Sequence, residues 1–310
     1  NSGRSTVYAP NGIVATSQPL ATSAGLEIML TGGNAIDAAV AAAAVLNLTE
    51  PHMTGMGGDM FAILWSEQEQ RLVGMNSAGP AGTMMTREEI IRRGHDDVPG
   101  SGPESVTVPG ALAGWAALIN RYGKLTLAEV LQPAIRLAEE GFPVSPIIAS
   151  NWSDQVGKLS RDAGATATFL IDGSRSPEAG EWFQNPELAS SFRQIAEHGP
   201  SVFYDGALGR HLVDGLRDLG GFLTYDDLKK VRVEWVEPVG VEYGDYKLYE
   251  LPPPGQGVAA LQMLRLLEDI DLKSMGHNSV EYLHHLIEAK KIAYADLAGH
   301  IGDPDYMRIS

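Results

Sequence analysis

The chain has 310 residues, 44% of them hydrophobic and 20% charged, which is enough apolar material for one large globular domain or two small ones. A formal net charge of −16 argues against nucleic acid or an anionic membrane as partner, because both require a basic face. The lack of cysteine excludes thiol catalysis, thiolate metal sites and disulfides. The sequence contains no run of eighteen apolar residues, so it predicts no membrane-spanning helix. Exported bacterial proteins often lack cysteine too, so the compartment, cytoplasm or periplasm, stays open.

The first predicted elements are a strand at residues 12–17 and a short amphipathic helix from Pro19 to Gly32. An alanine-rich helix follows at residues 35–47, because Ala has the highest helix propensity and Asn34 is a good N-cap. This helix is apolar on every side. We therefore expect it at the centre of a layered fold.

A glycine-rich turn at residues 55–58 comes next, and it fits either a tight helix-to-strand turn or a loop that lines a ligand. It is not a phosphate loop or a dinucleotide turn, because no Lys-Ser/Thr follows and the next element is a strand. Residues 60–65 and 71–75 predict an antiparallel hairpin.

The connection from residue 80 to residue 110 is polar and rich in Gly and Pro, which suggests a functional or mobile segment. It contains a predicted surface helix at residues 87–93 and a strand at residues 106–109. Further helices are expected at residues 111–122, 127–140 with an interruption at Pro133, 147–159, 187–197, 207–219, 224–230, 258–268 and 279–300. Residues 172–181 predict a polar loop, and residues 239–251 predict the clearest hairpin, turning at Gly244-Asp245.

A metal site on the last helix is one hypothesis for His284, His285 and Glu288, because imidazole and carboxylate groups one turn apart can bind the same cation. Their spacing is not that of a zinc-protease helix, so helix capping and ion pairing with Lys290 or Lys291 are the preferred reading. We expect no metal and no cofactor.

No catalytic group stands out in the sequence. A Gly-x-Ser-x-Gly elbow is absent, and the Ser and Thr residues are too many to rank as nucleophiles. The sequence also stops soon after a long helix without a closing strand. We expect this pattern from half of a fold that a second chain completes.

The ordered set of motifs resembles the large subunit of the gamma-glutamyltransferase family, also called gamma-glutamyl transpeptidases. The likeness runs through residues 32–40, 50–58, 106–110, 131–144, 220–228, 251–254 and 288–305. It implies an α+β fold, the four-layer αββα sandwich of N-terminal nucleophile hydrolases. On this resemblance residues 1–310 are the large (alpha) subunit, one domain shared with a small subunit from the same self-cleaved precursor.

The resemblance also implies the chemistry. The first residue of the small subunit would be a threonine whose hydroxyl is the nucleophile and whose free α-amino group is the base, so no catalytic residue lies in this sequence. An oxyanion hole on the small subunit would stabilise the tetrahedral intermediate of amide cleavage. The expected partners are that small subunit and a small-molecule amide substrate.

One position departs from the glutamyl-specific pattern. Ala78 stands where an arginine that grips the substrate's α-carboxylate is expected. The segments Gly57-Gly-Asp59 and Pro254-Gly-Gln-Gly257 look more like the amidohydrolase and acylase relatives, such as oxamate amidohydrolases and cephalosporin or glutaryl acylases.

We therefore expect an amide-bond hydrolase that is not specific for glutathione, with Asn76, Ser77 and Ala78 lining the acyl pocket. Strand-end hydrogen bonding is the other reading of Asn76 and Ser77. Two alternative functions stay open: a gamma-glutamyl transferase that uses another basic group such as Arg87, and a non-catalytic relative that kept the fold and lost the nucleophile.

Overall fold

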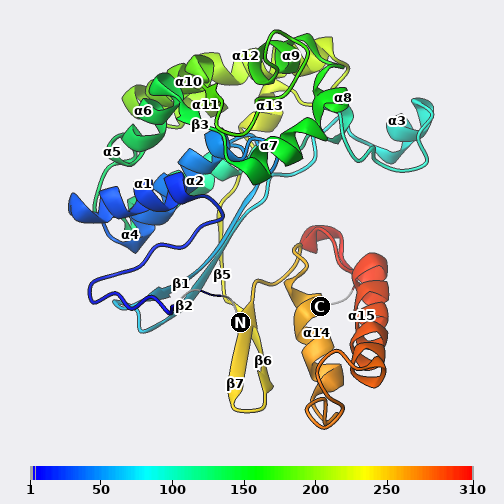
Figure 1. The fold of residues 1–310 in the computed structure, drawn as a ribbon. Helices are drawn as coiled ribbons and strands as arrows, with labels where there is room; N and C mark the ends of the chain where they lie inside the picture. Colours follow the sequence, from blue (N-terminus) through cyan, green and yellow to red (C-terminus); the bar gives the residue numbers. More distant parts are fainter. Residues whose placement is uncertain (1–2, 4, 309–310) are drawn as a thin grey trace. The chain divides into compact units, whose positions relative to one another are not determined.

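The structure is a computed structural model that describes residue 3 and residues 5–308 (Figure 1). The chain divides into two compact units. The first comprises Asn1–Met60 and Ser77–Arg232, and the second comprises Phe61–Asn76 and Val233–Ser310. Among the described residues, no helix combines the length and the hydropathy that a membrane-spanning segment needs.

The first unit is organised around α2 (Ala35–Thr49). This helix packs against α1 (Pro19–Leu30), α4 (Ala111–Tyr122) and α6 (Gln132–Glu140), and its alanine and valine side chains are mostly buried. Small side chains allow neighbouring helices to approach closely. The expectation of a central, buried helix is confirmed.

Helices make up most of the rest of the first unit, and two of its strands, β3 and β4, pair with each other. The remaining elements are α3 (Arg87–Arg92), α5 (Leu127–Val130), β3 (Phe142–Pro143), α7 (Pro146–Ser153), α8 (Val156–Leu159), α9 (Ala163–Phe169), β4 (Trp182–Phe183), α10 (Pro186–His198), α11 (Ser201–Tyr204), α12 (Ala207–Asp218) and α13 (Tyr225–Leu228).

Two strand predictions in this unit are wrong. Residues 12–17 form no strand, because Val14 lies against Gly25 of α1 and Thr16 bonds to the backbone at the start of that helix. Residues 106–109 are extended but join no sheet, because Val108 donates to the carbonyl of Pro80 and Pro109 has no N–H to donate.

The predicted interruption near Pro133 is confirmed, since α5 ends at Val130 and α6 begins at Gln132. The helix expected at residues 147–159 is two helices, α7 and α8. Helix α9 was not expected. Its signal is the N-cap Asp162, which accepts a hydrogen bond from the amide of Ala165 at 2.6 Å.

The second unit contains a three-stranded sheet in the order β1 (Met60–Ser66), β2 (Arg71–Ser77), β5 (Glu234–Val236). Strands β2 and β5 are antiparallel, with Met75 opposite Trp235. The neighbouring β1 and β2 are the predicted hairpin strands, and β5 was not expected.

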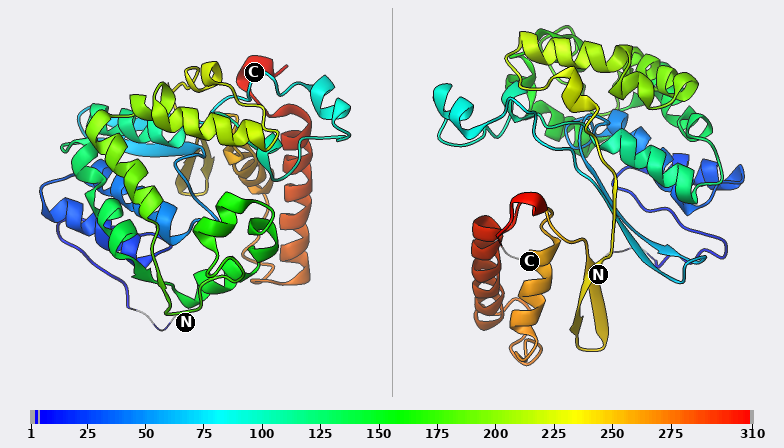
Figure 2. Two further views of the ribbon diagram at one scale, coloured as in Figure 1. Left: turned by 90° about the horizontal axis from the view of Figure 1, so that it is seen from above. Right: turned by 180° about the vertical axis from the view of Figure 1, so that it is seen from behind.

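The predicted hairpin in the second unit is confirmed as β6 (Val239–Tyr243) and β7 (Tyr246–Glu250), with Gly244 at φ 57° in the turn. Helices α14 (Gly257–Leu267) and α15 (Val280–His300) lie side by side, and α14 also contacts this hairpin (Figure 2). The fold of the described residues thus mixes helices with small sheets.

Candidate functional site

Three segments that the sequence singles out converge in the first unit. They are the glycine-rich turn at residues 55–59, the last residue of β2 with the segment after it (residues 77–82), and residues 108–111 before and at the start of α4. We call these three segments the glycine junction. They are separated by about twenty to thirty residues in sequence, so their contact is a result of the fold.

Backbone hydrogen bonds join these segments directly. The amides of Gly110 and Ala111 both donate to the carbonyl oxygen of Gly58, at 2.9 and 2.8 Å. The amide of Val108 donates to the carbonyl oxygen of Pro80 at 2.9 Å. Residues 108–111 therefore connect the glycine-rich turn to the end of β2.

Side chains add two further links at the end of β2. The hydroxyl of Ser77, which is fully buried, donates to the carbonyl oxygen of Gly110 at 2.8 Å. The amide of Gly79 donates to the Asp59 carboxylate at 3.0 Å. Both neighbours of Ala78 are thus anchored, which fixes the backbone at that position.

Two glycines in the junction are required by close approach of the backbone. A Cβ atom on Gly79 would lie 1.5 Å from the carbonyl oxygen of Val108. On Gly110 it would lie 1.9 Å from the carbonyl oxygen of Ser77. Real Cβ atoms never come that close, so any side chain at either position forces the segments apart.

The structure gives each predicted site residue a definite environment. Asn76 is half-buried, and its side-chain amide donates to the carboxylate of Glu234 of β5 at 3.3 Å within the second unit. Ser77 uses its hydroxyl inside the junction, while Ala78 is half-buried. Arg87, the alternative basic group, is exposed at the first position of α3. Asn76 and Ser77 therefore make hydrogen bonds at the end of the strand, which is one of the two interpretations that the sequence allows for them.

Tyr204 supports the junction from behind and was not expected from the sequence. Its hydroxyl donates to the carbonyl oxygen of Pro109 and accepts from the amide of Ala113, both at 3.0 Å. Burial raises the pKa of Tyr204 well above its usual range, so the phenol stays protonated and can donate. No spacing or motif in the sequence links residue 204 to residue 109.

A second unexpected support holds the chain just after the junction. Asp227 is almost completely buried and accepts hydrogen bonds from the backbone and hydroxyl of Thr83 and from the Lys230 ammonium, the last at 2.9 Å. Its other oxygen accepts from the hydroxyl of Thr224 at 2.7 Å, which completes the predicted helix-start box.

The pKa of Asp227 reflects this environment. Burial by itself raises the pKa, but hydrogen bonds from Thr83, Lys230 and Thr224 outweigh it and hold the pKa well below the usual range. The carboxylate is therefore charged at neutral pH and acts as a structural anchor.

The junction provides shape and backbone groups, and it provides no activated nucleophile of its own. The hydroxyl of Ser77 is buried and gives its proton to a carbonyl oxygen, which cannot serve as a base. Such a site can position a substrate against a nucleophile that another chain supplies.

The histidines of α15 have local partners. The Glu288 carboxylate pairs with Lys291 at 2.8 Å, which lowers the pKa of Glu288, and a ring nitrogen of His285 lies 2.9 Å from the Glu281 carbonyl oxygen. Across residue 3 and residues 5–308, no group of three or more His, Asp or Glu side chains is arranged to hold a metal ion.

Comparison with known proteins adds a family and several relatives. Residues 21–310 match the sequence profile described as Gamma-glutamyltranspeptidase. The glutathione hydrolase-like YwrD proenzyme of Bacillus subtilis is 38% identical over 94% of this chain. The acylase ACY 1 proenzyme of Pseudomonas sp. (strain SE83) is 39% identical over 96% of it.

The same similarity holds in three dimensions. The crystal structure of cephalosporin acylase from Bacillus halodurans matches with a TM-score of 0.93 and 40% identity, covering 100% of this chain and 58% of that one. The chain spans about half the length of the curated relatives it matches, 55% of each of the two named above.

Proposed function

Because the chain belongs to the gamma-glutamyltranspeptidase family, we propose that it is the larger part of an amide-bond hydrolase that works through an acyl-enzyme. In this proposal the nucleophile is the threonine at the start of a second chain cut from the same precursor, with its α-amino group as the base. The assembled protein would be the four-layer αββα sandwich, one domain shared by the two chains.

Two observations support a second chain. The named relatives are proenzymes of nearly twice this length. Strand β1 also exposes Phe61 (45%), Ile63 (40%) and Trp65 (55%), which alternate along the strand and so share one face of it. An exposed apolar face of this kind marks a surface that a partner covers.

Ala78 is the observation that carries the specificity part of the proposal. The glycine junction anchors Ser77 and Gly79 on either side of it, so the backbone at Ala78 is held in a fixed position. A methyl group cannot form the bidentate pair by which an arginine binds a carboxylate. We propose that Asn76, Ser77 and Ala78 border an acyl pocket that does not select for an α-carboxylate.

Two anilides that differ only in that carboxylate test the proposal: γ-glutamyl-p-nitroanilide and 4-aminobutyryl-p-nitroanilide. For the wild-type protein we expect kcat/KM values within about fivefold of each other, because no charged clamp separates the two substrates. Ala78→Arg should raise the ratio in favour of the γ-glutamyl substrate by about tenfold or more, the worth of one charge-assisted hydrogen bond.

Matched variants separate charge from size. Ala78→Met adds volume without charge and should leave the ratio unchanged, and Ala78→Lys should change it less than arginine because lysine lacks the planar fork. A wild-type protein that already prefers the γ-glutamyl substrate by about a hundredfold or more would overturn the specificity claim.

The two alternatives give different results. A gamma-glutamyl transferase that uses Arg87 would show that wild-type preference and lose it in Arg87→Ala. A non-catalytic relative would hydrolyse neither anilide, and its second chain would start with a residue other than threonine.

A further inference from the structure

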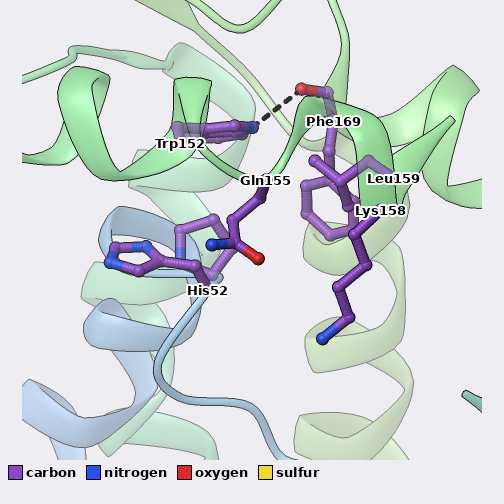
Figure 3. Close-up of a pocket in the computed structure, with 7 residues that line it drawn as sticks. His52, Trp152, Gln155, Lys158, Leu159 and Phe169 are labelled. Carbon is purple, nitrogen blue, oxygen red and sulfur yellow. Dashed lines mark hydrogen bonds between the residues drawn. The ribbon is translucent and has the colours of Figure 1, made fainter. Parts of the chain in front are cut away.

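A cavity of about 150 Å³ lies in the first unit, between the turn that follows α2 and helices α7 to α9. Its walls come from Pro51 and His52, from Trp152 of α7, from the α8 region at Gln155 and Lys158, and from Phe169 of α9 (Figure 3). These residues differ from those of the glycine junction, so the cavity is a separate feature of the unit.

The inner wall of the cavity is aromatic and rigid. Trp152 is buried, and its indole N–H already donates to the carbonyl oxygen of Phe169 at 3.0 Å (Figure 3). The two rings meet edge to face with centroids 6.2 Å apart. Since the indole N–H is occupied, Trp152 and Phe169 present apolar surface to any occupant.

His52 and Gln155 supply the uncharged polar groups of the cavity, and the Gln155 side chain carries both an N–H donor and a carbonyl acceptor. The side-chain amide nitrogen of Asn151 lies 3.4 Å from Nε2 of His52. Nδ1 of His52 is buried and has no hydrogen-bond partner in the described part of the chain. A buried ring nitrogen without a hydrogen-bond partner is unusual in a folded protein.

Lys158 adds the charge. Its side chain lines the cavity, is exposed at its outer end, and makes no ion pair with any residue between 5 and 308. In a chain with a net charge of −16, a lysine without a carboxylate partner is a locally cationic spot. One formal charge at the rim matches one negative charge on a ligand.

We propose that this cavity binds a small organic monocarboxylate whose apolar body is about the size of a benzene ring. Cavities of about 150 Å³ lined by apolar side chains accept benzene, which sets the size of that body. The carboxylate would lie toward Lys158 and the side-chain N–H of Gln155, and the body would lie against Trp152 and Phe169. The proposal goes beyond the amide hydrolysis proposed above and does not depend on it.

Benzoate is the probe, titrated by calorimetry into the full protein with any partner chain present. Benzamide has the same shape without the charge. We expect it to bind about tenfold more weakly, because it lacks one charge-assisted contact. The larger 1-naphthoate should not bind, because it exceeds the cavity.

Variants locate the binding. Lys158→Met and Gln155→Met should each weaken benzoate binding by about fivefold. Lys290→Met changes a lysine on α15 of the second unit and should leave benzoate binding unchanged. No saturable binding up to about 10 mM, equal binding of benzamide, or insensitivity to both cavity variants would overturn the proposal. Ala78→Arg should leave benzoate binding unchanged, so this test and the specificity test fail independently.

Discussion

Single residues in the glycine junction have no room for a side chain, which leads to a first prediction. Gly79→Ala would place a methyl group 1.5 Å from the carbonyl oxygen of Val108, so the segments must separate. We expect the free energy of unfolding to fall by about 1–3 kcal/mol, as in other overpacked sites. We also expect kcat/KM for amide hydrolysis to fall by more than this loss of stability accounts for. Urea denaturation and kcat/KM on the two anilides measure both effects.

Gly57→Ala is the matched control, because Gly57 lies in the glycine-rich turn of the same junction and a Cβ there meets nothing within 4 Å. If the two alanine variants proved equally stable and equally active, the junction would not be a close-packed contact.

Asp227 gives a prediction about pH at the same scale. Its pKa in the folded state is lowered, so its stabilising effect is complete above the unfolded pKa of about 3.9 and fades as pH falls toward the folded pKa. Asp227→Asn should lower the free energy of unfolding by about 2–3 kcal/mol at neutral pH. The difference from wild type should shrink as pH drops below about 4.

The neighbouring Asp226 is exposed, so Asp226→Asn should change stability little at any pH. A wild-type advantage over Asp227→Asn that stayed constant down to pH of about 2 would show that the carboxylate charge is irrelevant there.

At the scale of elements, the start of α2 is tied to the end of α4. Asn34 and Asp37 form a capping box, and the side-chain NH2 group of Asn34 also donates to the Tyr122 carbonyl oxygen at 2.6 Å. The buried Asp37 carboxylate accepts from the backbone of Lys124 at 3.0 Å as well as from Asn34 at 2.8 Å. One carboxylate thus caps one helix and fixes the turn after another.

Asp37→Ala should therefore cost more than an ordinary cap. We expect a loss of about 3 kcal/mol in the free energy of unfolding, since several backbone N–H groups lose their acceptor inside the protein. Glu129→Ala removes the same member of the exposed capping box of α5 and should lower the free energy of unfolding much less than Asp37→Ala does. Thermal denaturation of the two variants side by side decides whether the tertiary role of Asp37 is real.

The elements also show how far sequence reasoning reaches. Helices whose signals are local, such as α2 with its cap and the pair α5 and α6 with Pro133 at the break, were predicted nearly to the residue. Residues 106–109 have the composition of a strand but pair with a single carbonyl, and no local pattern reveals that. Helix α9 is short and rich in Ala, Thr and Gly, so its N-cap is the sequence feature that indicates it.

The candidate site shows the same limit. Each glycine motif was visible in the sequence, but their meeting at the junction depends on tertiary contacts between segments. Tyr204 and Asp227 act on that junction through hydrogen bonds across 95 and 144 residues of chain, respectively. A hydroxyl or carboxylate of this kind looks like any other until its burial and partners are known.

At the scale of the whole molecule, the proposed second chain should cover the exposed face of β1. Trp65 is 55% exposed in this chain, and Ile147 of α7 in the first unit is 74% exposed. If a partner buries Trp65 and leaves Ile147 in solvent, Trp65→Glu puts a charged side chain into an interface, whereas the charged side chain of Ile147→Glu stays in water. We expect Trp65→Glu to weaken the two-chain assembly and Ile147→Glu to leave it intact.

Intact-mass spectrometry with N-terminal sequencing of each chain, followed by sedimentation in increasing urea, makes the comparison. Wild type and Ile147→Glu should show two chains, the smaller beginning with threonine, that sediment together. Trp65→Glu should either release the smaller chain at lower urea or remain an uncleaved precursor, since in the proposed assembly the two chains share one core. An assembly as stable in Trp65→Glu as in wild type would mean that the face of β1 is not the partner's surface.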